Sequence, residues 1–451
     1  MNVLFSFNVA AKNGIFRFHT KCKETSLTYL CFADDLLLFC HGLLDSILGV
    51  VSILEKFYEF SGLRLNALKS ELFVCGVPVS LLDQIQSAIG FKIGQLPVRY
   101  LRVSLVTRKL TSKDCSALLV KIKNRIDHWS SRKLSFGGRL QLVKSVLSSI
   151  FGYWSRQIIL PKGVVNDIEK LCMRFFWKSS DTTARGARVS WSQICSLKSE
   201  GGLGLRRLVD WSKACCLMLV KNILAGEGSL WIAWIKDYCF KSLDYWNVDR
   251  KPHFSWILNK LIKLREEARR LFISVSIWPQ IKGGWIWDRI CDRRDKVGWH
   301  RLIWFPSHIP KFSIIAWMVI LDRLPTKDRL ARFGIVTVNV CGLCGDNQES
   351  RNHLFLECSF ARVIWKAILH ACGLQLQLLT CWDNAMHWMI SNLKGEDFME
   401  LVGAHEKALS TIDAAETGTV AEQSIGEGPE GDDATESVYG KFQNGKEKWG
   451  L

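Results

Sequence analysis

The sequence predicts an α+β protein in which a mixed N-terminal region is followed by mainly helical segments. Residues 1–110 combine two short apolar runs with a helical pattern at 43–62 and a β-branched, aromatic run at 96–106. Residues 111–290 repeat apolar side chains at helical spacing, with Lys and Arg on the other face. Residues 291–390 add a small helical domain with a Cys/His cluster. Residues 391–451 are acidic and without periodicity, so we expect a disordered tail.

Composition and charge limit the classes of partner. The chain has 451 residues, 48% of them hydrophobic, and a formal net charge of +17. Residues 391–451 hold 5 Lys and Arg against 13 Asp and Glu, so residues 1–390 carry +25. A body this basic favours a polyanionic partner, most simply nucleic acid.

The distribution of cysteines and the length of the apolar runs bear on the cellular location of the chain. The 16 cysteines are scattered, and the N-terminus lacks a basic start followed by a long apolar run. The longest apolar stretches, such as 312–321, are too short to span a bilayer. We therefore expect an intracellular, reducing location, in the nucleus or cytoplasm and not in a membrane. Paired cysteines there more readily bind metal than form disulfides.

The mixed region is expected to alternate between strands and helices. Two short strands flank an acidic pair, and the helix at 43–62 ends at Gly62, a natural C-terminal stop. Residues 63–77 alternate loosely and predict a return to strand, with Asn66 and Lys69 in the turn. Residues 96–106 predict one further strand.

Asp34 and Asp35 lie side by side in YLCFADDLLLFC (29–40). Adjacent carboxylates repel and are costly to desolvate, so a neutralising cation is the simplest reason to place them between apolar runs. A hairpin with two Asp at its tip can hold carboxylates for two-metal phosphoryl transfer. The alternative is a solvated loop tip.

Several longer strings resemble, in order and spacing, the reverse transcriptases of plant non-LTR (LINE-type) retrotransposons. They include LTYLCFADDLLLFCHG, FSGLRLNALKSELF, LPVRYLRVSLV, HWSSRKLSFGGRLQLVKSVLSSI and PKFSIIAWMVILDRLPTKDRL, and the resemblance covers about residues 1–390. It implies a partial polymerase palm at 1–110, a basic thumb or connector at 111–290, and a reverse-transcriptase zinc-binding domain at 291–390. It also implies RNA-directed DNA polymerase ancestry, with RNA and DNA in a template–primer duplex as a sequence-independent partner.

The resemblance assigns roles in the palm. Asp34 is the metal ligand and Asp35 its adjacent partner, with Mg²⁺ as the ion if activity is retained. Lys69 is a candidate phosphate contact, and its alternative is an exposed turn lysine.

The region that resembles a palm departs from the family pattern in two ways. A reverse transcriptase palm takes a further carboxylate from an upstream strand, whereas Glu24 is the only acidic residue before Asp34 here. Arg102 and Ser104 stand where the family has Gly and Pro. We therefore expect no polymerase activity from this chain alone.

The pattern C-x2-C-x8-H-x4-C sets Cys341, Cys344, His353 and Cys358 as candidate zinc ligands. Four protein ligands leave no open position, so the Zn²⁺ would be structural. The alternative places Cys358 and His353 on a buried helix face and leaves Cys341 a free surface thiol.

A group of basic residues near Trp129 and Phe136 is the candidate nucleic-acid contact, as the resemblance to a polymerase thumb implies. Its members are Lys121, Lys123, Arg125, Arg132, Lys133, Arg139 and Lys144. The alternative is a solvated cationic face over a helical core.

Three hypotheses about function follow. The chain is the C-terminal part of a reverse transcriptase with Asp34 in its active site, or a non-catalytic, zinc-stapled remnant that binds RNA or DNA. The third hypothesis is a translated relic without function, which the abrupt acidic tail favours.

Overall fold

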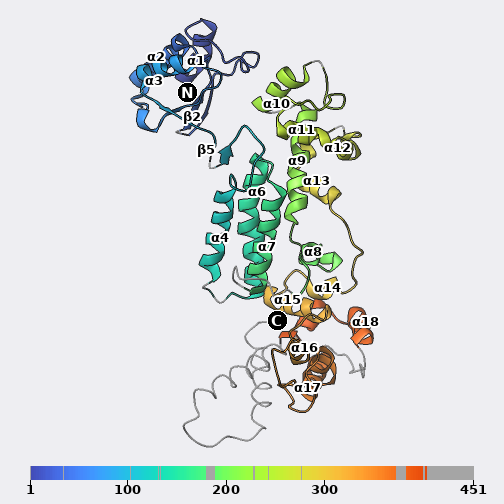
Figure 1. The fold of residues 1–451 in the computed structure, drawn as a ribbon. Coiled ribbons are helices and arrows are strands. Elements are labelled where there is room, and N and C mark those ends of the chain that lie inside the picture. The colour runs from blue at the N-terminus through green and yellow to red at the C-terminus, as the bar shows by residue number, and fades with distance from the viewer. Residues whose placement is uncertain are drawn as a thin grey trace, which may run out of the picture. The chain divides into compact units, whose positions relative to one another are not determined.

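The computed structural model describes residues 2–33, 35–101, 103–130, 132, 134–178, 188–226, 229–241, 243–275, 277–371, 382–399 and 402–403. This part of the chain is mainly helical, with three separate two-stranded sheets (Figure 1). The coarser form of the predicted class, helices with a few short strands, is confirmed. The chain divides into two compact units, Met1–His300 and Arg301–Leu451. The palm and thumb assignments remain predictions.

The acidic motif lies in an antiparallel hairpin. Strand β1 (Tyr29–Phe32) pairs with β2 (Asp35–Leu38), with Phe32 opposite Asp35. Ala33, in the turn that follows β1, has a φ of 52°. Short hairpin turns require this left-handed conformation. The two predicted strands are thus confirmed.

The hairpin is only partly buried. Tyr29 and Leu38 pack against a core formed by helices α1 (Asn2–Lys12) and α2 (Leu44–Ser61). Phe32, by contrast, is 60% exposed, and no third strand pairs with the hairpin in the described part of the chain. The two strands are therefore less buried than their apolar residues alone would predict.

The segments after the hairpin agree with the prediction in part. Helix α2 confirms the helix expected at 43–62 and ends at Gly62, with a φ of 70°. The strand expected at 63–77 is much shorter than predicted: only β3 (Glu71–Leu72) is extended, and the 3-10 turn η1 (Ala67–Lys69) precedes it. Helix α3 (Val79–Ile89) leads to β4 (Lys92–Ile93), which pairs in parallel with β3.

The single strand expected at 96–106 is wrong. The segment forms an antiparallel hairpin of β5 (Val98–Tyr100) and β6 (Val103–Leu105). Leu101 in its turn has a φ of 49°. The turn contains no Gly, Asn or Asp, which are the residues that usually indicate a hairpin turn in a sequence. The β-branched residues on either side therefore predicted one continuous strand.

The helical middle is confirmed, and helix α4 (Ser116–Ser130) shows why it forms. Its residues Leu118, Ile122 and Ile126 recur every four positions and are fully buried. They face α6 (Ser148–Gln157) and α7 (Lys162–Lys178), which contact α4. The other elements of this unit are α5 (Phe136–Leu142), η2 (Val143–Leu147), α6 (Ser148–Gln157), α7 (Lys162–Lys178), α8 (Trp191–Cys195), η3 (Lys198–Glu200), α9 (Leu208–Ala225), α10 (Leu230–Ile235), η4 (Lys236–Phe240), α11 (Trp256–Lys263), α12 (Arg265–Phe272), η5 (Trp278–Gln280) and α13 (Gly283–Ile290).

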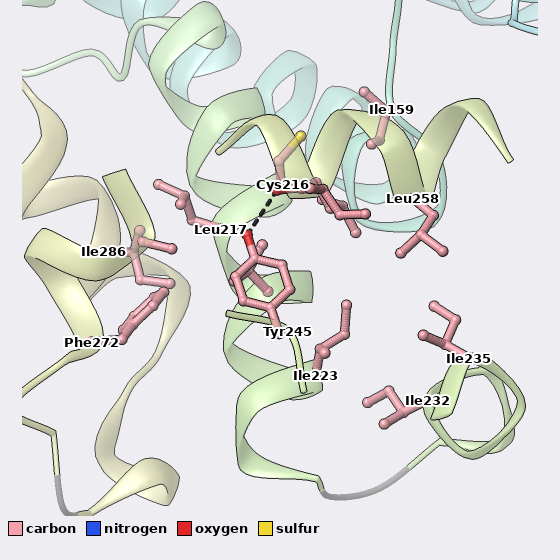
Figure 2. Close-up of a cluster of buried hydrophobic side chains, with 14 of the residues drawn as sticks. Ile159, Cys216, Leu217, Ile223, Ile232, Ile235, Tyr245, Leu258, Phe272 and Ile286 are labelled. Carbon is pink, nitrogen blue, oxygen red and sulfur yellow. Dashed lines mark hydrogen bonds between the residues drawn. The ribbon is translucent and has the colours of Figure 1, made fainter. Parts of the chain in front are cut away.

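A large apolar cluster surrounds α9 (Figure 2). Leu217 and Ile223 of α9 meet Leu258 of α11 and Ile286 of α13. Tyr245 is 2% exposed, and its hydroxyl donates a hydrogen bond of 2.8 Å to the backbone oxygen of Leu261. The one polar group that Tyr245 carries into the core is therefore satisfied.

The second unit is helical apart from a single β-bridge among its described residues. Helix α14 (His300–Ile303) begins at the boundary, and α15 (Pro310–Ile320) is buried over most of its central part, from Ser313 to Val319. The remaining elements are α16 (Lys327–Arg332), η6 (His353–Glu357), α17 (Ser359–Ala371) and α18 (Trp382–Asn392). The tail predicted to be disordered lies mostly outside the described residues.

No single helix in the described ranges is both long and apolar enough to cross a bilayer. One bent pair, Leu208–Ala225 with Leu230–Phe240, passes that test on length and composition alone. Side chains of both helices belong to the apolar cluster around α9.

A buried carboxylate fixes the start of α4. Asp114 is 8% exposed and accepts hydrogen bonds of 2.7 Å from Arg108 and from both the backbone N–H and the hydroxyl of Thr111. The hydroxyl of Ser104 donates to the backbone oxygen of Asp114 at 3.0 Å, which ties β6 to the same point. These bonds, led by the one from Arg108, hold the pKa of Asp114 well below its usual range.

We expect Asp114→Ala to lower the free energy of unfolding by about 1–2 kcal/mol at pH 7, because Arg108 and Thr111 lose a buried, charged acceptor. The pKa of Asp114 is lower in the folded than in the unfolded chain. Its contribution is therefore complete above about pH 5 and fades as the pH falls below about 4. Denaturant titrations of the wild-type chain and the variant at pH 7 and below about pH 4 measure the difference in the free energy of unfolding. Asp127→Ala, on the exposed face of the same helix, is the control; equal losses at pH 7 would contradict the assignment.

Candidate metal centre and nucleic-acid interface

Three cysteines and one histidine of the second unit converge. The Sγ atoms of Cys341, Cys344 and Cys358 and a ring nitrogen of His353 all lie within 4.8 Å of one another. The Sγ of Cys344 is 3.2 Å from Nε2 of His353. All but Cys344 are buried. The four residues that the spacing selected are therefore brought to one point by the fold.

A short hairpin and one π-helical turn present these four groups. The backbone N–H of Cys341 donates to the oxygen of Asn347 at 2.7 Å, and that of Gly345 donates to the oxygen of Cys341 at 3.0 Å. Gly345 has a φ of 74°, which lets the chain turn sharply just after the second cysteine. His353 begins η6, and the N–H of Cys358 closes that turn by donating to the oxygen of His353 at 2.8 Å.

The electrostatics of the cluster favour a bound cation. The backbone N–H of Asp346, aided by other donors that include His353, lowers the pKa of the Cys344 thiol to about 6. Burial raises the pKa of Cys341 to about 11 and also raises that of Cys358. Two of the three thiols thus need a positive charge to ionise. Zn²⁺ supplies that charge, and three cysteines with one histidine are a usual ligand set for structural zinc.

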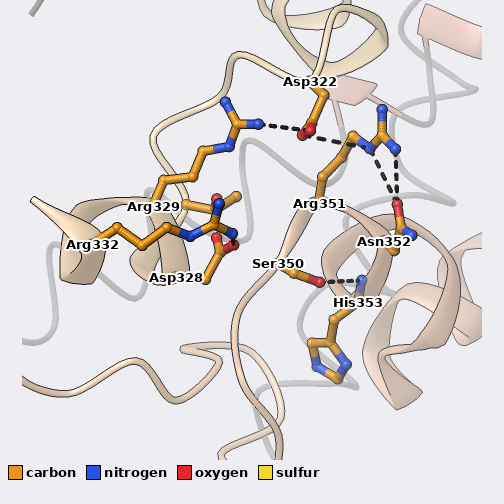
Figure 3. A network of polar contacts seen from close by, with 9 residues as sticks. Asp322, Asp328, Arg329, Arg332, Ser350, Arg351, Asn352 and His353 are labelled. Atoms are coloured by element: carbon orange, nitrogen blue, oxygen red, sulfur yellow. Dashed lines mark hydrogen bonds and ion pairs between the residues drawn. The ribbon is translucent and has the colours of Figure 1, made fainter.

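An ion-pair network supports the histidine ligand (Figure 3). Asp322 pairs with Arg329 at 2.6 Å and with Arg351 at 3.7 Å. The guanidinium of Arg351 also lies 4.3 Å from the centre of the Trp382 ring. Because Arg351 precedes His353 by only two residues, these contacts fix the backbone that carries the ligand.

The residues predicted to form a palm site are placed only in part. Asp35 begins β2 and is exposed, whereas Asp34 lies outside the described residues. Lys69 ends η1 and is exposed, and no hydrogen bond or ion pair joins it to Asp35 in the described chain. Tyr100 of β5 was not singled out from the sequence. Its pKa is raised by burial and by the charges of Asp35 and Cys31.

A basic groove runs along α4. Lys121 and Arg125 lie one helical turn apart, and Asn124 and His128 form the adjacent row on the same exposed surface. Arg99 of β5 completes the groove. Its volume is about 640 Å³, and its lining consists of Arg99, Ser116, Ala117, Val120, Lys121, Asn124, Arg125 and His128. Helical spacing could have revealed Asn124 and His128, but Arg99 is brought there only by the tertiary fold.

The other predicted basic contacts are dispersed. Lys123 is exposed on α4 but does not line the groove. Arg132 follows the helix and Lys144 lies on η2, both exposed. Arg139 differs from them because its side chain is buried. Lys133 lies outside the described residues.

A family match covers the metal centre, and a second comparison gives a partial relative of the chain. Residues 284–365 match the family described as zinc-binding in reverse transcriptase, and this range includes the four candidate ligands. The chain is also 35% identical over 127 residues to the Arabidopsis thaliana protein named "Putative ribonuclease H protein". That match covers 28% of this chain and 20% of the relative, so it spans about a fifth of the relative's length. The chain therefore carries a reverse-transcriptase-associated zinc-binding domain.

We expect the purified chain to hold about one zinc ion, and Cys344→Ser to lose most of it, because three remaining ligands bind structural zinc poorly. Elemental analysis after dialysis measures the metal. Near-ultraviolet circular dichroism should show a matching loss of order in the second unit. Cys75→Ser, which changes an exposed cysteine far from the cluster in sequence, is the control. If the Cys344→Ser variant holds as much zinc per chain as the wild type, the proposed ligand set is wrong.

Proposed function

We propose that this chain is a zinc-stapled, nucleic-acid-binding part of a LINE-type retrotransposon reverse transcriptase. It binds RNA and DNA in a template–primer duplex without reading their sequence. The groove along α4 is the observation that carries this proposal. The zinc ion has a structural role, because it holds the second unit together and takes no part in chemistry.

The lining of the groove suits a phosphate backbone. Arg99, Lys121 and Arg125 are cationic, Asn124 can donate hydrogen bonds, and no lining residue is acidic. Lys121 and Arg125 are separated by four residues, or about 6 Å along the helix axis, so they can engage different phosphates of one strand. Contacts of this kind are charge-assisted and independent of base sequence. The net charge of +25 on residues 1–390 supports the same partner.

The zinc-binding match supports the ancestry in this proposal. The matched range ends at residue 365 and covers the Cys/His cluster with its supporting Arg351. The retrotransposon origin and the duplex partner go beyond that match and rest on the sequence resemblance together with the groove.

A second candidate function is RNA-directed DNA synthesis with Mg²⁺ at Asp34 and Asp35. The tight β1–β2 hairpin that carries Asp35 favours it. Two-metal transfer needs carboxylates around both ions. Within the described ranges, Asp35 belongs to no cluster of three metal-binding side chains. We therefore expect no primer extension by this chain. Mg²⁺-dependent extension that Asp34→Ala abolishes would establish the enzymatic function instead.

The binding function is tested by reversing charge in the groove. We expect Lys121→Glu with Arg125→Glu to weaken binding to a short RNA–DNA duplex about tenfold or more at low salt. The slope of log affinity against log salt concentration should fall by about 2, because two phosphate contacts are lost. Fluorescence anisotropy over a range of salt concentrations measures both quantities.

The matched control changes two exposed basic residues that do not line the groove. Lys263→Glu with Arg270→Glu removes the same charge from α11 and α12. If both double variants weaken binding equally, the effect is one of net charge and the groove has no special role. Affinity of the wild-type chain that does not change with salt would contradict the proposed function itself.

A further inference from the structure

A second groove lies in the zinc-binding unit, beside the metal cluster. Its volume is about 800 Å³, a size typical of ligand sites. Helix α16 forms one wall, and the hairpin at 339–350, which carries Cys341 and Cys344, forms the other. His353 of the metal cluster also lines the groove. None of these lining residues belongs to the groove along α4.

Three side-chain amides distinguish this second groove, which we call the amide groove. They belong to Asn339, Asn347 and Gln348. Asn347 and Gln348 are exposed and Asn339 is half-buried, and none of the three amides has a hydrogen-bond partner among the described residues. Each amide presents a donor and an acceptor side by side in one plane. The groove therefore offers paired hydrogen-bonding groups that a ligand can satisfy.

The backbone holds the amides in place. The N–H of Cys341 donates to the oxygen of Asn347 at 2.7 Å, and the N–H of Glu349 donates to the oxygen of Asn339 at 2.7 Å. The carboxylate of Glu349 is buried and accepts a hydrogen bond of 2.9 Å from the backbone N–H of Lys327, which joins the hairpin to the start of α16. Both walls are thus fixed without a ligand, so that binding costs little ordering of the chain.

The charges of the amide groove are unfavourable for a phosphate ligand. Asp328 and Glu357 bring two carboxylates to the lining. The guanidinium of Arg332, which also lines the groove, is already paired with Asp328 at 2.8 Å (Figure 3). A phosphate would be repelled by both carboxylates and would compete with one of them for the arginine. The groove therefore suits a neutral ligand.

An unpaired nucleobase fits this lining better than a peptide does. Peptide recognition uses pockets for side chains, and Ala331 is the one apolar residue among the described residues that line the groove. The edge of a base carries adjacent donors and acceptors that pair with an Asn or Gln amide, and its amino groups can donate to carboxylates. The guanidinium of Arg332, held by Asp328, offers a flat face on which a base can stack.

We propose that the amide groove binds unpaired nucleobases of single-stranded nucleic acid. This proposal rests on the proposed function for the kind of partner, and it adds contacts with bases to the contacts with the phosphate backbone. An amide turned by half a rotation exchanges its donor and its acceptor, so one groove can pair with more than one kind of base. The contact requires a base without requiring a particular sequence.

Strands with and without bases test the amide groove. A short single-stranded DNA of mixed sequence is compared with an abasic strand of the same length, which keeps every phosphate. We expect the wild-type chain to bind the strand with bases more tightly. Asn339→Ala with Gln348→Ala should weaken binding of that strand about tenfold and leave binding of the abasic strand unchanged, because the change removes hydrogen bonds and no charge. Fluorescence anisotropy at constant salt measures the four affinities.

The matched control removes two exposed amides outside the groove. Asn384→Ala with Asn392→Ala changes helix α18 and should keep both wild-type affinities. Elemental analysis checks that each variant holds as much zinc as the wild type. If the groove variant loses zinc, Gln348→Met, which keeps the length of the side chain, takes its place. It should weaken binding of the strand with bases alone, and an unchanged affinity would refute the site.

The failure of the site and the failure of the proposed function give different results. Equal wild-type affinities for the two strands, or an equal loss for both strands in the groove variant, would overturn the base site and leave backbone binding intact. Binding that depends on Lys121 and Arg125 but not on Asn339 and Gln348 would do the same. If neither strand nor an RNA–DNA duplex binds, the proposed function fails and the base site is rejected with it.

Discussion

The burial of one apolar face of α4 is the constraint on which the basic groove depends. Leu118, Ile122 and Ile126 are sealed in the core, and a helix of 3.6 residues per turn allows no independent rotation of its other faces. Fixing the apolar face therefore also fixes where Lys121 and Arg125 point. Asp114 adds an anchor at the start of the helix by satisfying donors from the preceding loop. The cations are thus placed as a set by the packing of the helix.

In the second unit, the ionisation of the cysteine thiols determines how the Cys/His cluster is held together. Its cluster brings two thiols with raised pKa values, Cys341 and Cys358, next to the readily ionised Cys344 and to His353. Such a group is poorly stabilised by burial alone, because burial opposes the ionised form of each thiol. A divalent cation reverses that balance for Cys341 and Cys358 and binds the thiolate of Cys344 directly. Metal binding and the folding of the surrounding hairpin and η6 turn are then one event.

The features that could be predicted from the sequence are those whose causes are local. The helix before Gly62, the apolar spacing of α4 and the C-x2-C pair each depend on residues a few positions apart, and the structure has all three. The hairpin at 98–105 was missed because Leu101 takes a left-handed conformation that its side chain does not favour. The groove was missed in part because Arg99 reaches α4 only through the tertiary fold.

Burial also divides cations that look alike in the sequence. Lys121 and Arg125 are exposed, so salt screens their attraction for an anion, and each adds little without the other. Arg139 follows the same basic pattern, but its side chain is buried and lies over the Phe136 ring, where screening by salt is weak. Residues that form one basic group in the sequence therefore differ in exposure, and only the exposed ones are available to the nucleic acid that we propose as the partner.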